Sequence, residues 1–212
     1  MIFNRESLHE LPYSVEEIYE IKASGKYHSF KKRYKSNSKH LYYKDRLSGK
    51  LRYDTLLTED SRSGYQFYQH YFEGSDMECF TSASNAAIFK WLKDHEDKKV
   101  FVIADGAAFG SEIDRIMKMR SFENIRLCLP ESFEWLILKS GLIKDHDISV
   151  ILEDPSSYIE CAEHFSWENF FERLLIDSTV DTPFQYEKKE LNPIYFVKSN
   201  ADKIIMEIYV SR

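Results

Sequence analysis

The sequence lacks a long apolar run, and none of its segments approaches the ~18 consecutive apolar residues that a membrane-spanning helix needs. Its first residues also lack the basic and apolar regions of a signal peptide. Only three cysteines occur, and they are far apart in apolar surroundings, which predicts reduced thiols rather than a disulfide framework. These absences predict a cytoplasmic protein with no membrane partner.

Several sequence signatures of enzymes are missing as well. The chain has no G-x-x-x-x-G-K-[ST] loop and no G-x-G-x-x-G turn, so two common nucleotide-binding motifs are excluded. No His and Cys residues have the usual spacing of a zinc site, and no Ser or Cys lies in a signature of nucleophilic catalysis. With 212 residues, of which 43% are apolar, the chain is nevertheless long enough for a substantial hydrophobic core.

Positive charge is concentrated in one segment, the basic arm. Residues 22–52 hold eleven Lys or Arg and one acid, so the net charge of −6 conceals a strongly acidic remainder. Aromatic residues lie between the basic ones, a pattern typical of surfaces that contact phosphates and stack on bases. We therefore expect contact with DNA or RNA, with the candidate residues Lys31, Lys32, Arg33 and Lys35. The alternative is a solvated basic loop or hairpin on an acidic domain.

The hydrophobic pattern divides the chain into three parts. Residues 1–52 contain a predicted amphipathic helix over residues 1 to about 20, followed by the basic arm. Residues 53–150 alternate short apolar runs with helical segments, which predicts an α/β core with a mainly parallel sheet and flanking helices. Residues 151–212 predict a helical C-terminal tail, in which residues 203–210 form either a strand or a helix.

Acidic residues follow three of the predicted strands. The carboxyl ends of parallel strands meet at one edge of a sheet, where binding sites of open α/β sheets lie. Acids that converge there repel one another unless a cation neutralises them, and oxygen ligands favour Mg²⁺ or Mn²⁺. The candidate metal ligands are Glu59, Asp60, Asp105, Glu112, Glu131 and Glu134. For Glu112 and Glu131, the alternative is that an acid in the first turn of a helix complements the helix dipole.

The turn after Asp105 consists almost entirely of small residues. Gly106, Ala107, Ala108 and Gly110 follow the acid directly and precede a predicted helix. Such residues allow backbone amides to approach a phosphate closely. They also allow a strand and a helix to pack closely, which is the structural alternative.

The order of these acids resembles the Toprim fold of topoisomerases, primases and OLD-type nucleases. The resemblance covers residues 53–142, where one strand ends at Glu59, a strand–helix unit follows, and another strand ends at Asp105. The segment "LPESFEWLIL" is similar to the motif that opens the next helix in small Toprim-like proteins. The resemblance implies that Glu59 is a general acid/base or a ligand, that Asp105 is a metal ligand, and that Glu134 is a further ligand.

The resemblance also implies an activity and partners. Toprim-like nucleases hydrolyse phosphodiesters of DNA or RNA with Mg²⁺ or Mn²⁺, and some act beside an ABC-type ATPase in antiphage defence. This sequence departs from the family at Ala107, where the second Asp of an Asp-x-Asp motif is expected. Two interpretations therefore stay open: a metal-dependent nuclease, or a non-catalytic partner-binding or sensor module that has lost the second metal-binding Asp.

Two further segments carry predictions. Glu134 lies within "ESFEWLIL", a segment that is apolar nearly all round, so its carboxylate is expected to be buried and to need a partner. That partner is either the metal or a basic side chain such as Arg115. Phe165, Trp167, Phe170 and Phe171 form a dense aromatic cluster, which indicates a buried core helix or a subunit contact in a homo-oligomer.

Overall fold

The computed structural model describes residues 18–24, 27–33, 53–82, 84–106, 118–159 and 166–210, with positions 109, 112, 115 and 116. Ala107, Ala108, Gly110, Phe165 and Lys35 lie outside the described residues, as does the predicted helix before residue 18.

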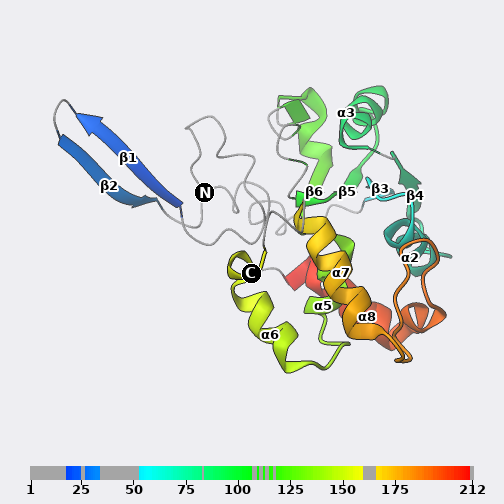
Figure 1. Ribbon diagram of the computed structural model, residues 1–212. Coiled ribbons are helices and arrows are strands. Elements are labelled where there is room, and N and C mark those ends of the chain that lie inside the picture. The colour runs from blue at the N-terminus through cyan, green and yellow to red at the C-terminus, as the bar shows by residue number, and fades with distance from the viewer. Residues whose placement is uncertain are drawn as a thin grey trace.

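The body of the protein is built on a four-stranded parallel sheet (Figure 1). Its strands are β3 (Thr55–Thr58), β4 (Glu78–Thr81), β5 (Val100–Ile103) and β6 (Ile125–Cys128), in the order β4-β3-β5-β6. β3, β5 and β6 are buried along their whole length, as expected of parallel strands that are covered on both faces. The predicted α/β fold is therefore confirmed.

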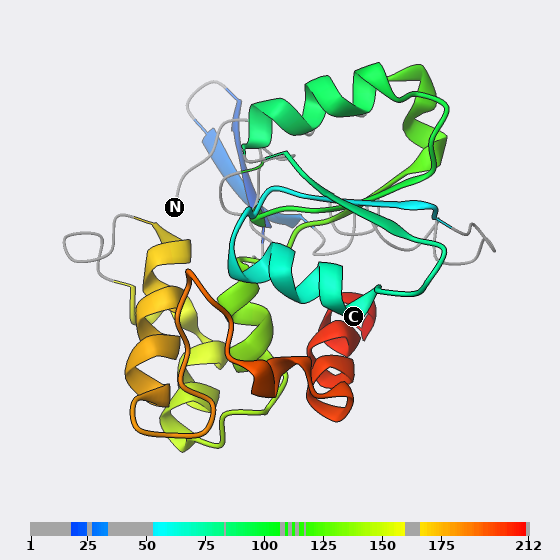
Figure 2. The same cartoon turned by 90° about the vertical axis from the view of Figure 1, so that its right-hand side faces the viewer.

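Helices cover both faces of this sheet (Figure 2). Among the described residues, the α-helices with defined bounds are α2 (Ser63–Tyr71), α3 (Asn85–Asp94), α5 (Phe133–Lys139), α6 (His146–Glu153), α7 (Trp167–Thr179) and α8 (Lys198–Val210). Short 3-10 turns lie at η2 (Arg120–Asn124), η3 (Pro155–Ser157) and η4 (Pro193–Phe196). In Figure 2, α3 (green) lies on one face, whereas α2 (cyan) and the C-terminal helices lie on the other.

The sheet divides the hydrophobic core into two clusters. Leu57, Val102 and Leu127 pack on the α3 side, whereas Leu56 and Phe101 pack on the α2 side. This alternation follows from the period of two residues with which strand side chains change face. Each strand therefore contributes to both clusters, which explains why the strands read as continuous apolar runs.

The C-terminal tail belongs to the same core as the sheet. Phe171, Leu175 and Ile204 are fully buried in the cluster on the α2 side. Residues 203–210, for which the sequence left strand and helix open, lie in α8. Burial of Phe170 and Phe171 supports the interpretation of their segment as a core helix. None of the described helices is long and apolar enough to cross a membrane.

The N-terminal part contains a hairpin. β1 (Ile18–Ser24) pairs antiparallel with β2 (Tyr27–Arg33), so the predicted helix is wrong for residues 18–20. The seven residue pairs of this hairpin override a local helix propensity, which is a weak preference in comparison with strand pairing. The candidate residues Lys31, Lys32 and Arg33 lie on β2, where Lys31 is the register partner of Glu20.

The strand order creates a topological switch point between β3 and β5. From β3 the chain moves outward to β4, then returns past β3 to β5 and continues to β6 on the opposite side. In sheets with this order, a crevice forms outside the carboxyl ends of the two central strands. Glu59 and Asp105 follow these two strands.

Candidate functional site

Glu59 and Asp105 lie next to each other at the switch point. The backbone N–H of Glu59 donates to the carbonyl oxygen of Ile103 at 3.3 Å, which continues the parallel pairing beyond the strands. The backbone of Asp105 lies close enough to the Glu59 carboxyl group to lower its pKa. The fold therefore brings together the two acids to which the sequence assigned the central roles.

The Glu59 carboxyl group has an unusual environment. Burial raises its pKa to about 7; the N–H of Asp105 lowers the pKa, whereas the negative charges of Glu168 and Asp60 raise it. One of its oxygens, Oε2, is buried and has no hydrogen-bond partner among the described residues. A carboxylate oxygen in this state favours either a proton or a cation.

Asp105 shares this acidic environment. Burial raises its pKa well above the usual value, and the charges of Glu168, Glu134, Glu59 and Asp60 raise it further. We call Glu59, Asp60, Asp105, Glu134 and Glu168 the acidic edge. Because like charges at short range disfavour one another, the acidic edge attracts protons and cations.

Asp60 has a structural partner at the start of α2. Its Oδ1 accepts from the N–H of Arg62 at 2.6 Å, and its Oδ2 accepts from the N–H of Gly64 at 2.8 Å. A Cβ atom at position 64 would lie 2.5 Å from that Oδ2, so the missing side chain of Gly64 makes room for the carboxylate. Asp60 thus satisfies free N–H groups at a helix N-terminus, where negative charge is favoured.

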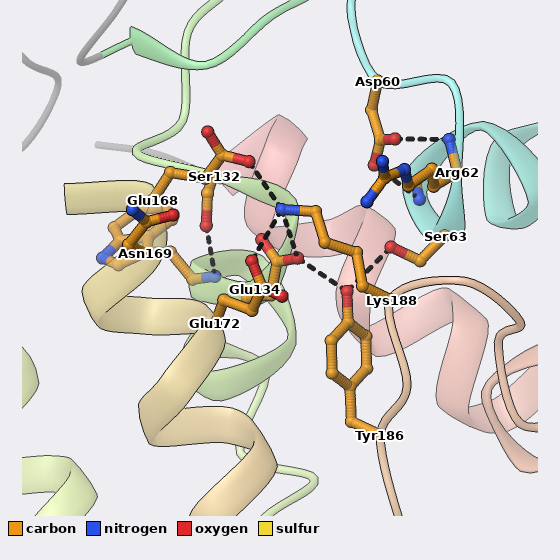
Figure 3. Close-up of polar contacts among 12 residues, drawn as sticks. Asp60, Arg62, Ser63, Ser132, Glu134, Glu168, Asn169, Glu172, Tyr186 and Lys188 are labelled. Carbon is orange, nitrogen blue, oxygen red and sulfur yellow. Dashed lines mark hydrogen bonds and ion pairs between the residues drawn. The ribbon is translucent and has the colours of Figure 1, made fainter. Parts of the chain in front are cut away.

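Glu134 is buried, as the sequence predicted, and lies in the first turn of α5 with a side chain only 2% exposed (Figure 3). Its Oε1 accepts a hydrogen bond of 2.6 Å from the hydroxyl of Tyr186, and the Tyr186 oxygen lies 2.7 Å from Ser63 Oγ. Because the tyrosine proton is directed to Glu134, Ser63 is the donor in the second contact. Burial raises the pKa of Glu134, and Lys188 and Tyr186 oppose that rise.

Lys188 is the basic partner of Glu134, at 3.8 Å from Oε1. Its ammonium also contacts Glu168 Oε1 at 2.6 Å and Glu172 Oε2 at 2.8 Å. Figure 3 shows Nζ between these carboxylates, which come from α5 and α7. Arg115, the example suggested by the sequence, instead pairs with Glu112 at 2.7 Å.

Two of the predicted metal ligands, Glu112 and Glu131, are not part of the acidic edge. Glu112 is paired with Arg115, whose guanidinium group lies over the ring of Phe89 at 4.1 Å. Glu131 is fully buried, but α5 begins at Phe133 with Ser132 as its N-cap. The expectation that Glu131 lies in the first turn of a helix is therefore wrong, because Ser132 accepts from the N–H of Trp135 and starts the helix later.

Gly106 shows why the turn after Asp105 lacks bulk. Its N–H donates to the carbonyl oxygen of Pro130 at 2.6 Å, so this amide has a partner within the chain. A Cβ atom at this position would lie 2.6 Å from the carbonyl oxygen of Leu129. At Gly106, the structure thus supports close packing of two backbone segments rather than approach to a phosphate.

Sequence reasoning did not identify Ser63, Glu168, Glu172, Tyr186 or Lys188. Tyr186 and Lys188 lie more than fifty residues from Glu134 along the chain, and no local motif marks them. The spacing of Glu168 and Glu172, which places both on one face of a helix, is the only available signal.

Within the described part of the chain, no group of three or more His, Cys, Asp or Glu side chains is arranged to hold a metal ion. No protein-family model matches the sequence, and no curated protein or solved structure matches it either.

Proposed function

We propose that the protein is a metal-dependent nuclease-like hydrolase, in which Glu59 and Asp105 bind one Mg²⁺ or Mn²⁺ ion at the switch point of the sheet. The observation that carries this proposal is the buried Oε2 of Glu59, which lacks a hydrogen-bond partner among the described residues and belongs to the acidic edge. The order of acids along the chain, which resembles Toprim proteins, supports the choice of phosphodiesters as substrates.

The carboxylates of Glu59 and Asp105 suit a divalent cation that prefers oxygen ligands. A cation beside Glu59 and Asp105 would offset the repulsion and burial that raise both pKa values. When bound, such a cation activates water and stabilises charge on a phosphate. Without a bound cation, the raised pKa of about 7 lets Glu59 accept or donate a proton near neutral pH, and a bound cation would lower that pKa.

Metal addition should stabilise the wild type. Millimolar Mg²⁺ or Mn²⁺ is expected to raise its Tm, because a ligand that binds only the folded state stabilises it. Asp105→Asn should fold but lose this rise, as measured by thermal unfolding with and without metal. Asp97→Asn is the matched control, since Asp97 is exposed in the loop after α3. Equal responses from wild type and Asp105→Asn would rule out the metal site.

A second candidate function is a non-catalytic module that binds a partner or acts as a sensor. It is favoured by Lys188, whose ammonium pairs with Glu134 and Glu168, two carboxylates whose charges act on Asp105. This candidate predicts no metal-dependent Tm rise and no cleavage of DNA or RNA. An ABC-type ATPase is the proposed partner under either function, and co-purification of the two proteins tests it.

The proposed nucleic-acid contact is the basic arm, part of which lies on β2. Replacing Lys31, Lys32, Arg33 and Lys35 with Ala should weaken binding to any DNA or RNA about tenfold at low salt. The dependence on salt should become shallower by about 0.9 in log–log slope for each phosphate contact that is lost. Fluorescence anisotropy with unrelated oligonucleotides at several salt concentrations measures both effects.

A matched control keeps the change in net charge the same. It replaces four exposed lysines of the body: Lys90, Lys93, Lys144 and Lys203. An equal loss in both variants would show that only overall charge matters, and no salt-sensitive binding by the wild type would leave the arm as a solvated face.

A further inference from the structure

Arg62 is a basic residue beside the acidic edge. It directly precedes α2 and lies three residues after Glu59, on the turn that leads from β3 into the helix. Its backbone N–H donates to Asp60 Oδ1 at 2.6 Å, and the N–H of Gly64 donates to the other oxygen of the same carboxylate at 2.8 Å. These two hydrogen bonds fix the path of the chain around Arg62.

The side chain of Arg62 is available to a ligand. In the view of Figure 3 it extends past Asp60, toward the side of the site where Glu134 and Lys188 lie. Arg62 is exposed to solvent, and its side chain forms no hydrogen bond or ion pair with any residue that the structure describes. The guanidinium group is therefore a positive charge next to the acidic edge whose donors can contact a bound molecule.

Other basic residues of this part of the molecule already have partners. The ammonium of Lys188 contacts three carboxylates, at 2.6, 2.8 and 3.8 Å, and two of its three donors are directed to them in hydrogen bonds. Arg115 pairs with Glu112 at 2.7 Å. Arg62 differs from both, because its five N–H donors are not used by the described residues.

A phosphate needs positive charge in order to approach the acidic edge. In addition to burial, the negative charges of Glu168 and Asp60 raise the pKa of Glu59, and the same charges repel a negatively charged phosphodiester. One divalent cation at the switch point offsets only part of this repulsion. A guanidinium group adds a further positive charge and offers two parallel N–H donors, which match the oxygens of a phosphate.

We infer that Arg62 is a substrate-binding residue, whose guanidinium group binds two oxygens of a phosphate in front of Glu59 and Asp105. The class of the substrate, a phosphodiester of DNA or RNA, rests on the proposed function. The contact orients one phosphate toward the two acids. In this respect Arg62 differs from the basic arm, whose contacts with phosphates do not depend on the acidic edge.

Binding of a labelled oligonucleotide tests this contact. Arg62→Ala should weaken the binding of a fluorescein-labelled single-stranded DNA about tenfold, because a pair of hydrogen bonds between charged groups is lost. Fluorescence anisotropy at one salt concentration, without metal and with Mn²⁺, measures the affinity. Arg62→Lys keeps the charge without the paired donors and should lose less. The matched control is Arg120→Ala, since Arg120 is exposed in η2, before the amino end of β6 and away from the site.

The outcomes separate this inference from the proposed function. If Mn²⁺ does not raise the Tm of the wild type but Arg62→Ala still binds DNA more weakly than Arg120→Ala, the contact is supported and the metal site is rejected. A metal-dependent rise in Tm, together with equal affinities of wild type and Arg62→Ala, would overturn the contact and leave the metal site in place. Equal losses in Arg62→Ala and Arg120→Ala would also overturn it, as would a wild type that binds no DNA.

The Tm of the variants shows whether a loss of binding reflects the contact itself. Because the Arg62 side chain is exposed and contacts no described residue, Arg62→Ala and Arg62→Lys should both have the Tm of the wild type without metal. A loss of affinity in step with a loss of stability would assign Arg62 a structural role and overturn the inference.

Discussion

Tyr186→Phe should destabilise the protein by about 2–3 kcal/mol at pH 8, because a hydrogen bond to a buried carboxylate is lost and the carboxylate remains. The tyrosine hydroxyl donates to Glu134 at 2.6 Å and contacts Ser63 at 2.7 Å, and Tyr186 is only 2% exposed. Phenylalanine fills the same space, so packing hardly changes. Urea unfolding at pH 8 measures the loss.

The loss should depend on pH. Burial already raises the pKa of Glu134, and removal of its donor raises it further. The ionised form carries the penalty, so the effect of the substitution is larger above the folded-state pKa and smaller at pH 5, where the carboxyl more readily holds a proton.

Tyr195→Phe is the matched control for Tyr186→Phe. Tyr195 is also buried, but its hydroxyl donates to the neutral carbonyl oxygen of Phe184 at 2.6 Å. Loss of this hydrogen bond should lower the free energy of unfolding by about 1 kcal/mol, and the effect should not depend on pH. In a Glu134→Gln background, Tyr186→Phe should also cost about 1 kcal/mol, so a double-mutant cycle reports the charged part of the interaction. A cycle without coupling would contradict the assigned contact.

Glu59→Gln should stabilise the metal-free protein by about 2 kcal/mol at pH 8. A rise in pKa from 4.5 to about 7 corresponds to roughly 3.4 kcal/mol, and the partial exposure of the side chain reduces this figure. Glutamine removes the charge that the buried environment disfavours. Thermal and urea unfolding of both proteins measure the gain.

The sign of the pH dependence follows from the direction of the shift. The unfolded chain releases the Glu59 proton near pH 4.5, and the folded protein holds it to about pH 7. Stability of the wild type is therefore lost as the pH rises through this window, and Glu59→Gln should show little gain at pH 4.5. Glu78→Gln, at an exposed ion pair with Lys98, is the control and should change stability by less than about 0.5 kcal/mol. An equal gain at both pH values would refute the environment assigned to Glu59.

With metal present, the effect of Glu59→Gln should reverse. A cation bound by Glu59 and Asp105 stabilises the wild type and not the variant, so the wild type becomes the more stable protein in Mn²⁺. A stability gain for the variant that persists in Mn²⁺ would favour the non-catalytic module.

The sequence by itself determined the strands and helices that position the candidate site. The apolar runs at β3, β5 and β6 predict buried parallel strands, because such strands are covered on both faces. Glu59 and Asp105 lie just beyond the ends of two of these strands, so their meeting at one edge could be predicted from chain order and sheet type alone. Burial of Glu134 could be predicted because apolar residues surround it in a helix.

Only the tertiary structure decided which partners these acids have. The partners of Glu134 are Tyr186 and Lys188, far along the chain, and their positions depend on how the C-terminal tail packs on α5. Local patterns carry no information about such distant contacts. The same reason explains why the helix predicted for residues 18–20 is wrong: these residues form a strand because they pair with β2. It also explains Gly106, because a side chain at this position would collide with the backbone of Leu129, just after β6.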